Sequence, residues 1–260
     1  MLPLGSIMRF LEQLAPLRLA EEWDNVGLLV GDPNRPVERV MTCLTITPTT
    51  AAEALRETAD LVVSHHPMPF QPLARLTTET TAGRLLLGLA GARVAVYSPH
   101  TAWDSAGEGI NQQLARMLGL RGVSPLVPAA EGQGTGRVGW LEEPLELDRL
   151  VGRVKQLLGL GQVQVVGRSG QAVRTIAVVC GAAGELLDPA RQAGYDCMLT
   201  GEARFHTCLE AEARGMSMIL VGHYASERLG AERLAELVAS QFPGLEVWAS
   251  RDERDVTRWL

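Results

Sequence analysis

Two adjacent histidines, His65 and His66, stand directly after the apolar run Leu61-Val62-Val63, at the end of a predicted strand. The chain has only five histidines, so placing two of them side by side is unusual. Adjacent side chains diverge in an extended segment, so the two imidazoles could face two different metal ions. A solvated polar turn, whose histidines bond to backbone carbonyls, explains the pair about equally well.

Three predicted strands end in similar side chains. They deliver His65 and His66, then His100 with Asp104, then His223 with Glu227. The carboxyl ends of strands in an open α/β sheet can converge on one crevice, and residues four apart share one face of a helical turn. A surface cap or ion pair would explain any single pair, but it does not explain four of five histidines at strand ends. His206 lies within a segment instead and is interpreted as a structural histidine.

These side chains make a mixed imidazole and carboxylate set without thiolates. Such a set suits Zn, Mn, Fe, Co or Ni and does not favour Ca or Mg. Asp104 and Glu227 would offset only half the charge of two divalent ions, so the site would attract anions. It would also lower the pKa of a bound water toward about 7, which generates hydroxide at neutral pH.

The elements that must position these residues alternate between strand and helix, which predicts an α/β fold with substantial parallel pairing. Apolar spacing and turn residues predict strands at 40–46, 61–64, 94–98, 162–166, 175–180, 197–199, 218–221 and 245–248, and helices at 7–19, 48–58, 78–90, 108–118, 147–158, 207–214 and from about 223 to 240. The turn at 181–184 is rich in glycine but lacks a nucleotide-binding spacing, so close packing of helix on strand is its expected role. Asp24 and Asn25 are read as turn residues first.

The stretch 128–136 is rich in small residues and turn formers, so a lobe boundary is expected near it. This gives an N-terminal α/β lobe at 1–127 carrying His65, His66 and Asp104, and a second α/β lobe at 128–217. A C-terminal segment at 218–260 carries His223 and Glu227 and is expected to pack back on the first lobe.

Composition narrows the class of protein. The 260 residues are 46% hydrophobic, enough for a real core in one large or two small domains. A formal charge of -6 leaves no basic stripe for nucleic acid. No apolar run approaches the roughly 20 residues that span a bilayer, and no signal segment is visible, so a soluble cytoplasmic protein without nucleic-acid or membrane partners is expected. The four cysteines form no C-x-x-C pair and are expected to be buried and reduced.

Several motifs together resemble the Nif-three-like dinuclear-metal family, also described as type 2 homologues of GTP cyclohydrolase I. The motifs are Asp24-Asn25-Val26-Gly27-Leu28, Ser64-His65-His66-Pro67, His100-Thr101-Ala102-Trp103-Asp104, Gly134-Thr135-Gly136-Arg137-Val138-Gly139, Thr200-Gly201-Glu202 and Gly222-His223-Tyr224-Ala225-Ser226-Glu227-Arg228. The resemblance covers most of the chain. It implies a three-layer α/β fold of two related lobes, a metal site in the cleft between them, and a toroidal homohexamer.

The resemblance also implies roles for individual residues. It implies that two divalent ions per chain (Zn, Fe, Mn, Co or Ni) are bound by His65, His66, Asp104, His223 and Glu227, with Glu227 bridging. His100 would lie beside the ions as an acid/base or substrate contact. The implied function is a metal-dependent, GTP cyclohydrolase-like hydrolase of a nucleotide or another small phosphorylated or cyclic-amide substrate, which is expected to be anionic. The alternative is a non-catalytic metal-binding or regulatory hexameric assembly protein.

The sequence departs from the family pattern at three places. Thr45 stands where members commonly carry Asp, the turn at 181–184 lacks a common serine, and the tail Ser250-Arg251-Asp252-Glu253-Arg254 is unusual. The chain is also too short for the CutA-like insertion of longer relatives, which implies a compact two-lobe form.

Overall fold

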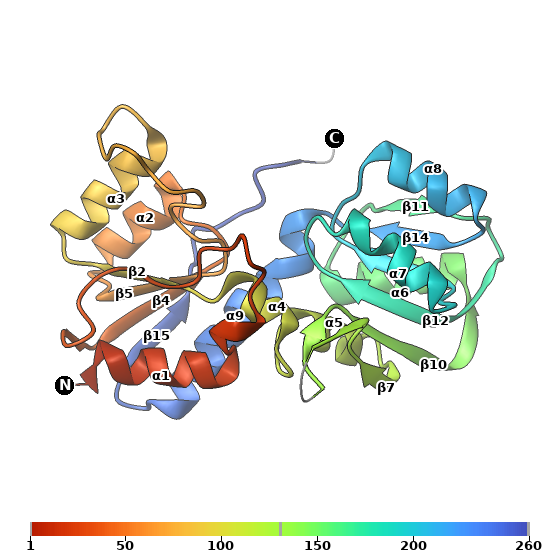
Figure 1. Cartoon of the computed structure of the whole chain (residues 1–260), viewed down its shortest axis with the longest axis horizontal. Coiled ribbons are helices and arrows are strands. Elements are labelled where there is room, and N and C mark those ends of the chain that lie inside the picture. The colour runs from red at the N-terminus through yellow and green to blue at the C-terminus, as the bar shows by residue number, and fades with distance from the viewer. Residues whose placement is uncertain (1, 130–131, 259–260) are drawn as a thin grey trace. The chain divides into compact units, whose positions relative to one another are not determined.

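The computed structural model describes residues 2–129 and 132–258, which form two compact units (Figure 1). Unit 1 is the chain up to Trp103 together with Arg228–Arg254, and unit 2 is Asp104–Glu227 with the residues from Asp255 on. The chain passes between units within helix α4 (His100–Ser105) and within helix α9 (His223–Gln241). The lobes predicted with boundaries after residues 127 and 217 stay a prediction. Residues 130–131 of that boundary stretch lie outside the described residues.

Unit 1 is built on a sheet with the strand order β15-β4-β5-β6-β2. Its strands are β2 (Gly27–Val30), β4 (Arg39–Cys43), β5 (Leu61–Ser64), β6 (Ala95–Ser98) and β15 (Glu246–Ala249). All neighbours pair in parallel except β2, which runs antiparallel to β6. The short strands β1 (Leu2–Pro3) and β3 (Pro36–Val37) pair with each other. The carboxyl ends of β5 and β6 therefore lie together, at the residues that precede His65 and His100.

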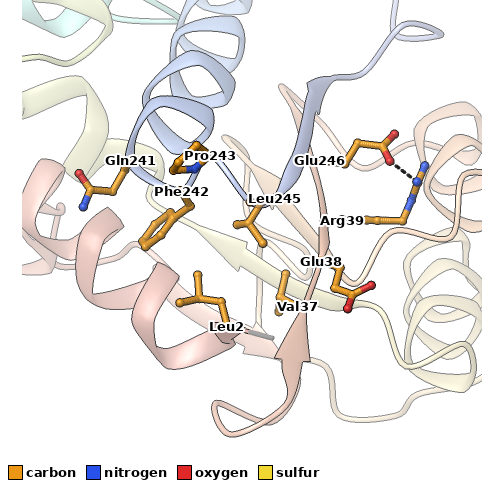
Figure 2. A pocket seen from close by; sticks show the side chains of 10 residues that line it. Leu2, Val37, Glu38, Arg39, Gln241, Phe242, Pro243, Leu245 and Glu246 are labelled. Atoms are coloured by element: carbon orange, nitrogen blue, oxygen red, sulfur yellow. Dashed lines mark hydrogen bonds and ion pairs between the residues drawn. The ribbon is translucent and has the colours of Figure 1, made fainter.

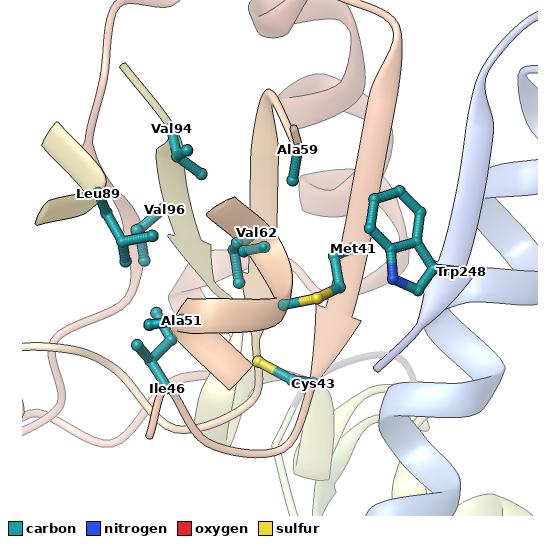
Figure 3. Close-up of a cluster of buried hydrophobic side chains, with 11 residues drawn as sticks. Met41, Cys43, Ile46, Ala51, Ala59, Val62, Leu89, Val94, Val96 and Trp248 are labelled. Carbon is teal, nitrogen blue, oxygen red and sulfur yellow. The ribbon is translucent and has the colours of Figure 1, made fainter. Parts of the chain in front are cut away.

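Helices cover both faces of this sheet. Side chains of α2 (Pro48–Arg56) and α3 (Thr81–Gly91) pack with Met41, Val62 and Val96 in one buried cluster (Figure 3). Successive strand residues point to opposite faces, and Thr42, the neighbour of Met41, donates its hydroxyl to Ala231 O of α9, 2.7 Å away. The helix α1 (Leu4–Leu14) buries Leu4, Ile7 and Leu11, and a short helix, η1 (Leu17–Leu19), follows it. Unit 1 thus has three layers.

A buried carboxylate in α2 fixes the tail that follows β15. Glu53 accepts hydrogen bonds from the Trp248 indole (3.1 Å), the Ser250 hydroxyl (2.5 Å), and the backbone N–H groups of Arg251 (2.9 Å) and Asp252 (3.1 Å). Burial raises the pKa of this carboxyl, but the four hydrogen bonds outweigh it and hold the pKa below its usual value. The unusual tail is therefore an ordered part of unit 1.

Unit 1 also carries an open groove of about 690 Å³, where the end of α9 meets β1, β3 and β15 (Figure 2). Leu2, Val37, Phe242 and Leu245 form its apolar part. Arg39 and Glu246 on its rim form an ion pair.

Unit 2 is built on a second sheet, with the strand order β11-β14-β13-β12-β10-β7. Its strands are β7 (Arg121–Ser124), β10 (Arg137–Glu146), β11 (Gln164–Val166), β12 (Ala172–Val179), β13 (Cys197–Thr200) and β14 (Ser217–Leu220). The central strands β12, β13 and β14 are parallel, and the outer strands pair antiparallel. The strands β8 (Val127–Pro128) and β9 (Gly134–Thr135) form a separate pair.

The second sheet is also covered on both faces. Leu187, Ala190 and Ala211 of α7 (Leu187–Gln192) and α8 (Phe205–Ala213) pack with Met198 and other buried residues, next to a short helix, η2 (Gly184–Leu186). Leu199, on the opposite face of β13, lies with Leu114 and Val154 of α5 (Ile110–Met117) and α6 (Leu147–Leu158) around a small cavity. Each unit is thus an α/β sandwich, so the predicted α/β class is confirmed.

Within residues 2–129 and 132–258, no helix is long and apolar enough to cross a membrane. The four cysteines are free thiols. Cys43, Cys180 and Cys197 are buried, as expected, whereas Cys208 is only half-buried.

Candidate metal centre

The backbone of the His65-His66 pair is held on several sides. β5 ends at Ser64, and the chain bends immediately afterwards. The amides of His65 and His66 donate to Cys43 O (2.9 Å) and Leu44 O (2.8 Å), which extends the pairing with β4. The Ser98 hydroxyl donates to His65 O at 2.6 Å, and the Ser64 hydroxyl donates to His66 O at 2.8 Å. The backbone that carries both imidazoles is therefore fixed by β4, Ser64 and Ser98.

The two imidazoles converge, and His100 joins them. Ring centroids of His65 and His66 are 5.1 Å apart, and the His100 ring lies 5.2 Å from the first and 5.5 Å from the second. One nitrogen from each of the three rings lies within 4.8 Å of the others. The expectation that the pair would diverge is wrong, because the histidines follow the strand at a bend and do not continue it.

Thr45, which stands where family members commonly carry Asp, orients His66. Its Nδ1 lies 2.7 Å from the Thr45 hydroxyl. The Thr45 amide donates to Glu253 Oε1 at 2.8 Å, and the Leu44 amide donates to Oε2 of the same carboxylate at 2.9 Å. The Glu253 side chain is nearly buried and lies 3.6 Å from the Arg228 guanidinium. The tail thus supplies a carboxylate that fixes the loop holding His66.

His100 is oriented by Asp24. The Asp24 carboxylate is fully buried, and its Oδ1 lies 2.7 Å from His100 Nδ1. Thr101 donates to Oδ2 from its amide (3.1 Å) and its hydroxyl (2.5 Å). Burial raises the pKa of Asp24, but the bonds from His100 and Thr101 outweigh it and leave the pKa below its usual value. Asp24 was interpreted first as a turn residue, and its contacts make it part of the site.

The backbone at His100 is strained. Its φ is 27°, in the left-handed region that residues with a side chain rarely adopt. Such a conformation costs on the order of 1–3 kcal/mol and is typical of functional positions. The hydrogen bonds that Asp24 accepts from His100 and Thr101 hold His100 in this conformation at the start of α4.

In unit 2, His223 lies between two carboxylates. Its Nε2 is 2.9 Å from Glu227 Oε2, one turn along α9, and its Nδ1 is 2.8 Å from Glu202 Oε1. The bond with Glu227 raises the pKa of His223 to about 9, with Glu202 adding to the effect and burial opposing it. The predicted pairing of these two residues on one helical face is confirmed.

Gly181 allows Glu227 to approach the turn after β12. A Cβ on Gly181 would lie 2.3 Å from Glu227 Oε1, and the residue has a φ of +67°. Ser226 fastens the same turn, since its hydroxyl accepts from the Gly181 amide (3.0 Å) and donates to His223 O (2.8 Å). The glycine-rich turn at 181–184 therefore has the packing role expected of it.

Asp104 is held at the end of α4 in unit 2. Its Oδ1 accepts from the Cys180 thiol at 3.3 Å. Burial, followed by the charges of Asp104 and Glu227, raises the pKa of that thiol, so it stays protonated as a donor. The buried Arg137 guanidinium donates to Ala106 O at 2.6 Å and Ser105 O at 3.2 Å, which caps the helix carrying Asp104.

Three histidines share a pattern that suits metal ligation. His66, His100 and His223 each bring Nδ1 to an oxygen, from Thr45, Asp24 and Glu202 respectively. An oxygen partner on Nδ1 fixes the ring and leaves Nε2 as the atom that can bind a metal or exchange a proton. The donor set therefore fits a divalent transition metal. Unit 1 brings together His65, His66 and His100, and unit 2 brings together His223 and Glu227.

Sequence comparison decides the family. The profile of the Duf34/NIF3 (NGG1p interacting factor 3) family matches residues 3–255. The chain belongs to this family. The resemblance drawn from the motifs is thereby confirmed.

Individual relatives agree with the family assignment. The chain is 31% identical over 229 residues to the GTP cyclohydrolase 1 type 2 homolog of Clostridium acetobutylicum, covering 87% of this chain and 85% of that protein. It is 34% identical over 263 residues to the protein of the same name from Streptomyces coelicolor, covering 97% and 92%. The crystal structure of a Bacillus cereus protein related to NIF3 superposes with a TM-score of 0.94 at 20% identity, covering 100% and 99% of the two chains. That likeness shows the fold.

Sequence reasoning gave no role to five contributors to the site, one of which is Glu202, the partner of His223 Nδ1. Asp24 looked like a turn residue, and Thr45 and Glu253 looked like departures whose effect was open. Cys180 was expected only to be a buried thiol. Asp24 and Glu202 carried a signal, since each stands in a motif shared with the family.

Proposed function

We propose that this protein binds two divalent metal ions through His65, His66, Asp104, His223 and Glu227, and that it hydrolyses a small anionic substrate with His100 as acid/base. The observation that carries the proposal is the set of histidines whose Nδ1 atoms are fixed by oxygen partners. At His66 and His223 this leaves Nε2 to bind an ion, and at His100 it leaves Nε2 to exchange a proton. Glu227, 4% exposed, is the carboxylate proposed to bridge the ions.

Bound ions would supply Lewis acidity and a water of lowered pKa. The chain's own contribution is at His100. With Asp24 Oδ1 accepting the Nδ1–H, Nε2 is the atom that takes a proton from the attacking water and returns it to the leaving group. The carboxylate also stabilises the imidazolium that forms in between, as an orienting group does in other hydrolases.

The names of relatives suggest where to look for a substrate. Proteins at 31% and 34% identity are named GTP cyclohydrolase 1 type 2 homolog, which makes nucleotides the first class to test. Other small phosphorylated compounds and cyclic amides come next, because a metal-activated water attacks both kinds of bond. The alternative function, a non-catalytic metal-binding assembly, predicts metal uptake without turnover.

The test is a hydrolase screen on protein loaded separately with Zn, Mn, Fe, Co or Ni, using GTP, other nucleotides, phosphoesters and small amides. We expect turnover with at least one metal, and we expect His100→Asn to lower it by about 10²- to 10⁴-fold while metal content is retained. His206→Asn, which changes an exposed histidine on α8, is the matched control. Metal uptake with no turnover of any substrate would favour the alternative, and loss of metal in His100→Asn would make His100 a ligand instead of an acid/base.

A further inference from the structure

Two exposed aromatic rings stand beside His100. Trp23 is 58% exposed and Phe70 is 48% exposed, which is unusual for side chains of this size. Their ring centroids are 5.8 Å apart, with the planes tilted by 38°. Each centroid also lies 5.9 Å from the His100 ring, at steep interplanar angles of 75° and 73°. His100 therefore does not stack on either ring, and both are open to a ligand.

The pair is held in place by the residues that follow Trp23. Asp24 is fixed to His100 and Thr101, as described above. Asn25 donates from its side-chain amide to Pro69 O at 2.8 Å, which fastens the loop that carries Phe70 to the loop that carries Trp23. Three consecutive residues thus act together. Trp23 supplies one ring, Asp24 orients His100, and Asn25 anchors the loop that carries Phe70. Aromatic residues held this way provide a preformed surface, which lowers the entropic cost of binding.

The charges nearby indicate which part of a substrate lies there. Glu21 and Glu22 precede Trp23 and are exposed, so this end of the site repels a phosphate. It suits an uncharged or amino-bearing group instead. Aromatic side chains bind planar rings by stacking, worth about 1–3 kcal/mol for each base.

We propose that Trp23 and Phe70 form a stacking subsite for a planar nitrogen heterocycle of the substrate, with the anionic part of the same molecule directed toward the proposed metal ions. The stacking subsite narrows the substrate class of the proposed function. Only the orientation of the anionic group toward the metal ions rests on that proposed function. The subsite excludes open-chain and saturated-ring phosphoesters as preferred substrates. It assigns a role to two residues that neither the ligand set nor the acid/base requires.

The test compares two probes that share ribose 5-phosphate, only one of which carries a planar heterocyclic base. Guanosine 5′-monophosphate and ribose 5-phosphate are titrated calorimetrically into the zinc-loaded full chain. We expect the nucleotide to bind more tightly, Trp23→Leu to weaken it about tenfold or more, and Trp23→Phe to restore most of the affinity. Ribose 5-phosphate should bind the parent and Trp23→Leu equally. Trp140→Leu, which removes a 44% exposed indole on β10, should change the affinity for neither probe.

Three results would overturn the subsite. The first is the absence of nucleotide binding, and the second is an unchanged nucleotide affinity in Trp23→Leu. The third is a loss of affinity for ribose 5-phosphate in Trp23→Leu as large as the loss for the nucleotide. A change in the mass of Trp23→Leu by light scattering would also overturn it, because the rings would then be covered by a second copy of the chain. Zinc uptake is measured on the same samples. Failure to take up zinc contradicts the proposed metal site alone, and the ring comparison is then judged on the metal-stripped chain.

Discussion

The hydroxyl of Thr45 lies 2.7 Å from Nδ1 of His66, which fixes the ring of a proposed metal ligand. Replacing the hydroxyl with a methyl group in Thr45→Val keeps the shape but removes this partner. We expect metal affinity to fall about 10- to 100-fold, the usual effect of losing a group that orients a ligand. Calorimetric titration of metal-stripped protein with Zn or Mn measures it.

Thr45→Ser is the matched control, because it keeps the hydroxyl. It should retain affinity close to that of the parent. Equal losses in Thr45→Val and Thr45→Ser would mean that the methyl packing of Thr45, and not its hydroxyl, supports the site.

Glu253 supports the same loop through the Leu44 and Thr45 amides. Glu253→Gln leaves one of the two amides without its acceptor, so we expect faster amide exchange at Leu44 or Thr45 and a smaller loss of metal affinity than in Thr45→Val. Asp252→Asn changes the neighbouring carboxylate, which pairs with Arg56 at the surface, and should alter neither quantity. Unchanged exchange at both Leu44 and Thr45 in Glu253→Gln would contradict this role of the tail.

Glu53 should be among the most sensitive positions for stability. Glu53→Gln replaces an acceptor of four hydrogen bonds with a group that places N–H donors against donors, so we expect a loss of about 2–3 kcal/mol in the free energy of unfolding. Glu57→Gln, at the end of the same helix, removes only a surface ion pair and should cost less than about 1 kcal/mol. Urea unfolding of both variants measures the difference.

The same carboxylate predicts a dependence on pH. Its pKa is lowered in the folded state, so its stabilisation is fully present above the unfolded pKa, near 4.5, and is lost as the pH falls through the folded pKa. The parent should therefore lose stability relative to Glu53→Gln on acidification below about pH 4.5. A constant difference between the two proteins from pH 7 to pH 3 would show that Glu53 does not titrate as described.

The homohexamer implied by the family resemblance stays a prediction. Light scattering at micromolar concentration is expected to give six times the mass of the chain. A monomer mass across that range would refute it.

Much of the fold followed from local pattern. The strand at 61–64 and the helix at 147–158 were predicted with their observed bounds, because each is a short apolar run or an amphipathic repeat with a clear stop. The strand β10 was missed. It contains Pro144 and several exposed charged residues, so neither alternation nor an apolar run marks it. Its pairing with β12 and β7 is decided by tertiary contacts.

The candidate site likewise contains residues that the sequence could predict and residues that it could not. Histidines at strand ends were visible in the sequence because their residue type is rare and chemically specific. The groups that orient them were not, since Thr45 and His66 are separated by 21 residues and Leu44 and Glu253 by 209. The convergence of His65 and His66 also depends on a bend that an extended-strand prediction could not contain. Such contacts are set by topology, and no local spacing encodes them.

Metal stoichiometry tests the central claim most directly. Elemental analysis after equilibration with Zn, Mn, Fe, Co or Ni should give about two ions per chain in the parent. Glu227→Gln should lower the content and affinity of both ions, whereas His223→Ala should empty mainly one position. Glu202→Gln is the control, because the Glu202 carboxylate contacts the Nδ1 side of His223, and it should retain both ions. A parent that takes up none of these metals, or a Glu227→Gln variant that keeps full stoichiometry and affinity, would contradict the account.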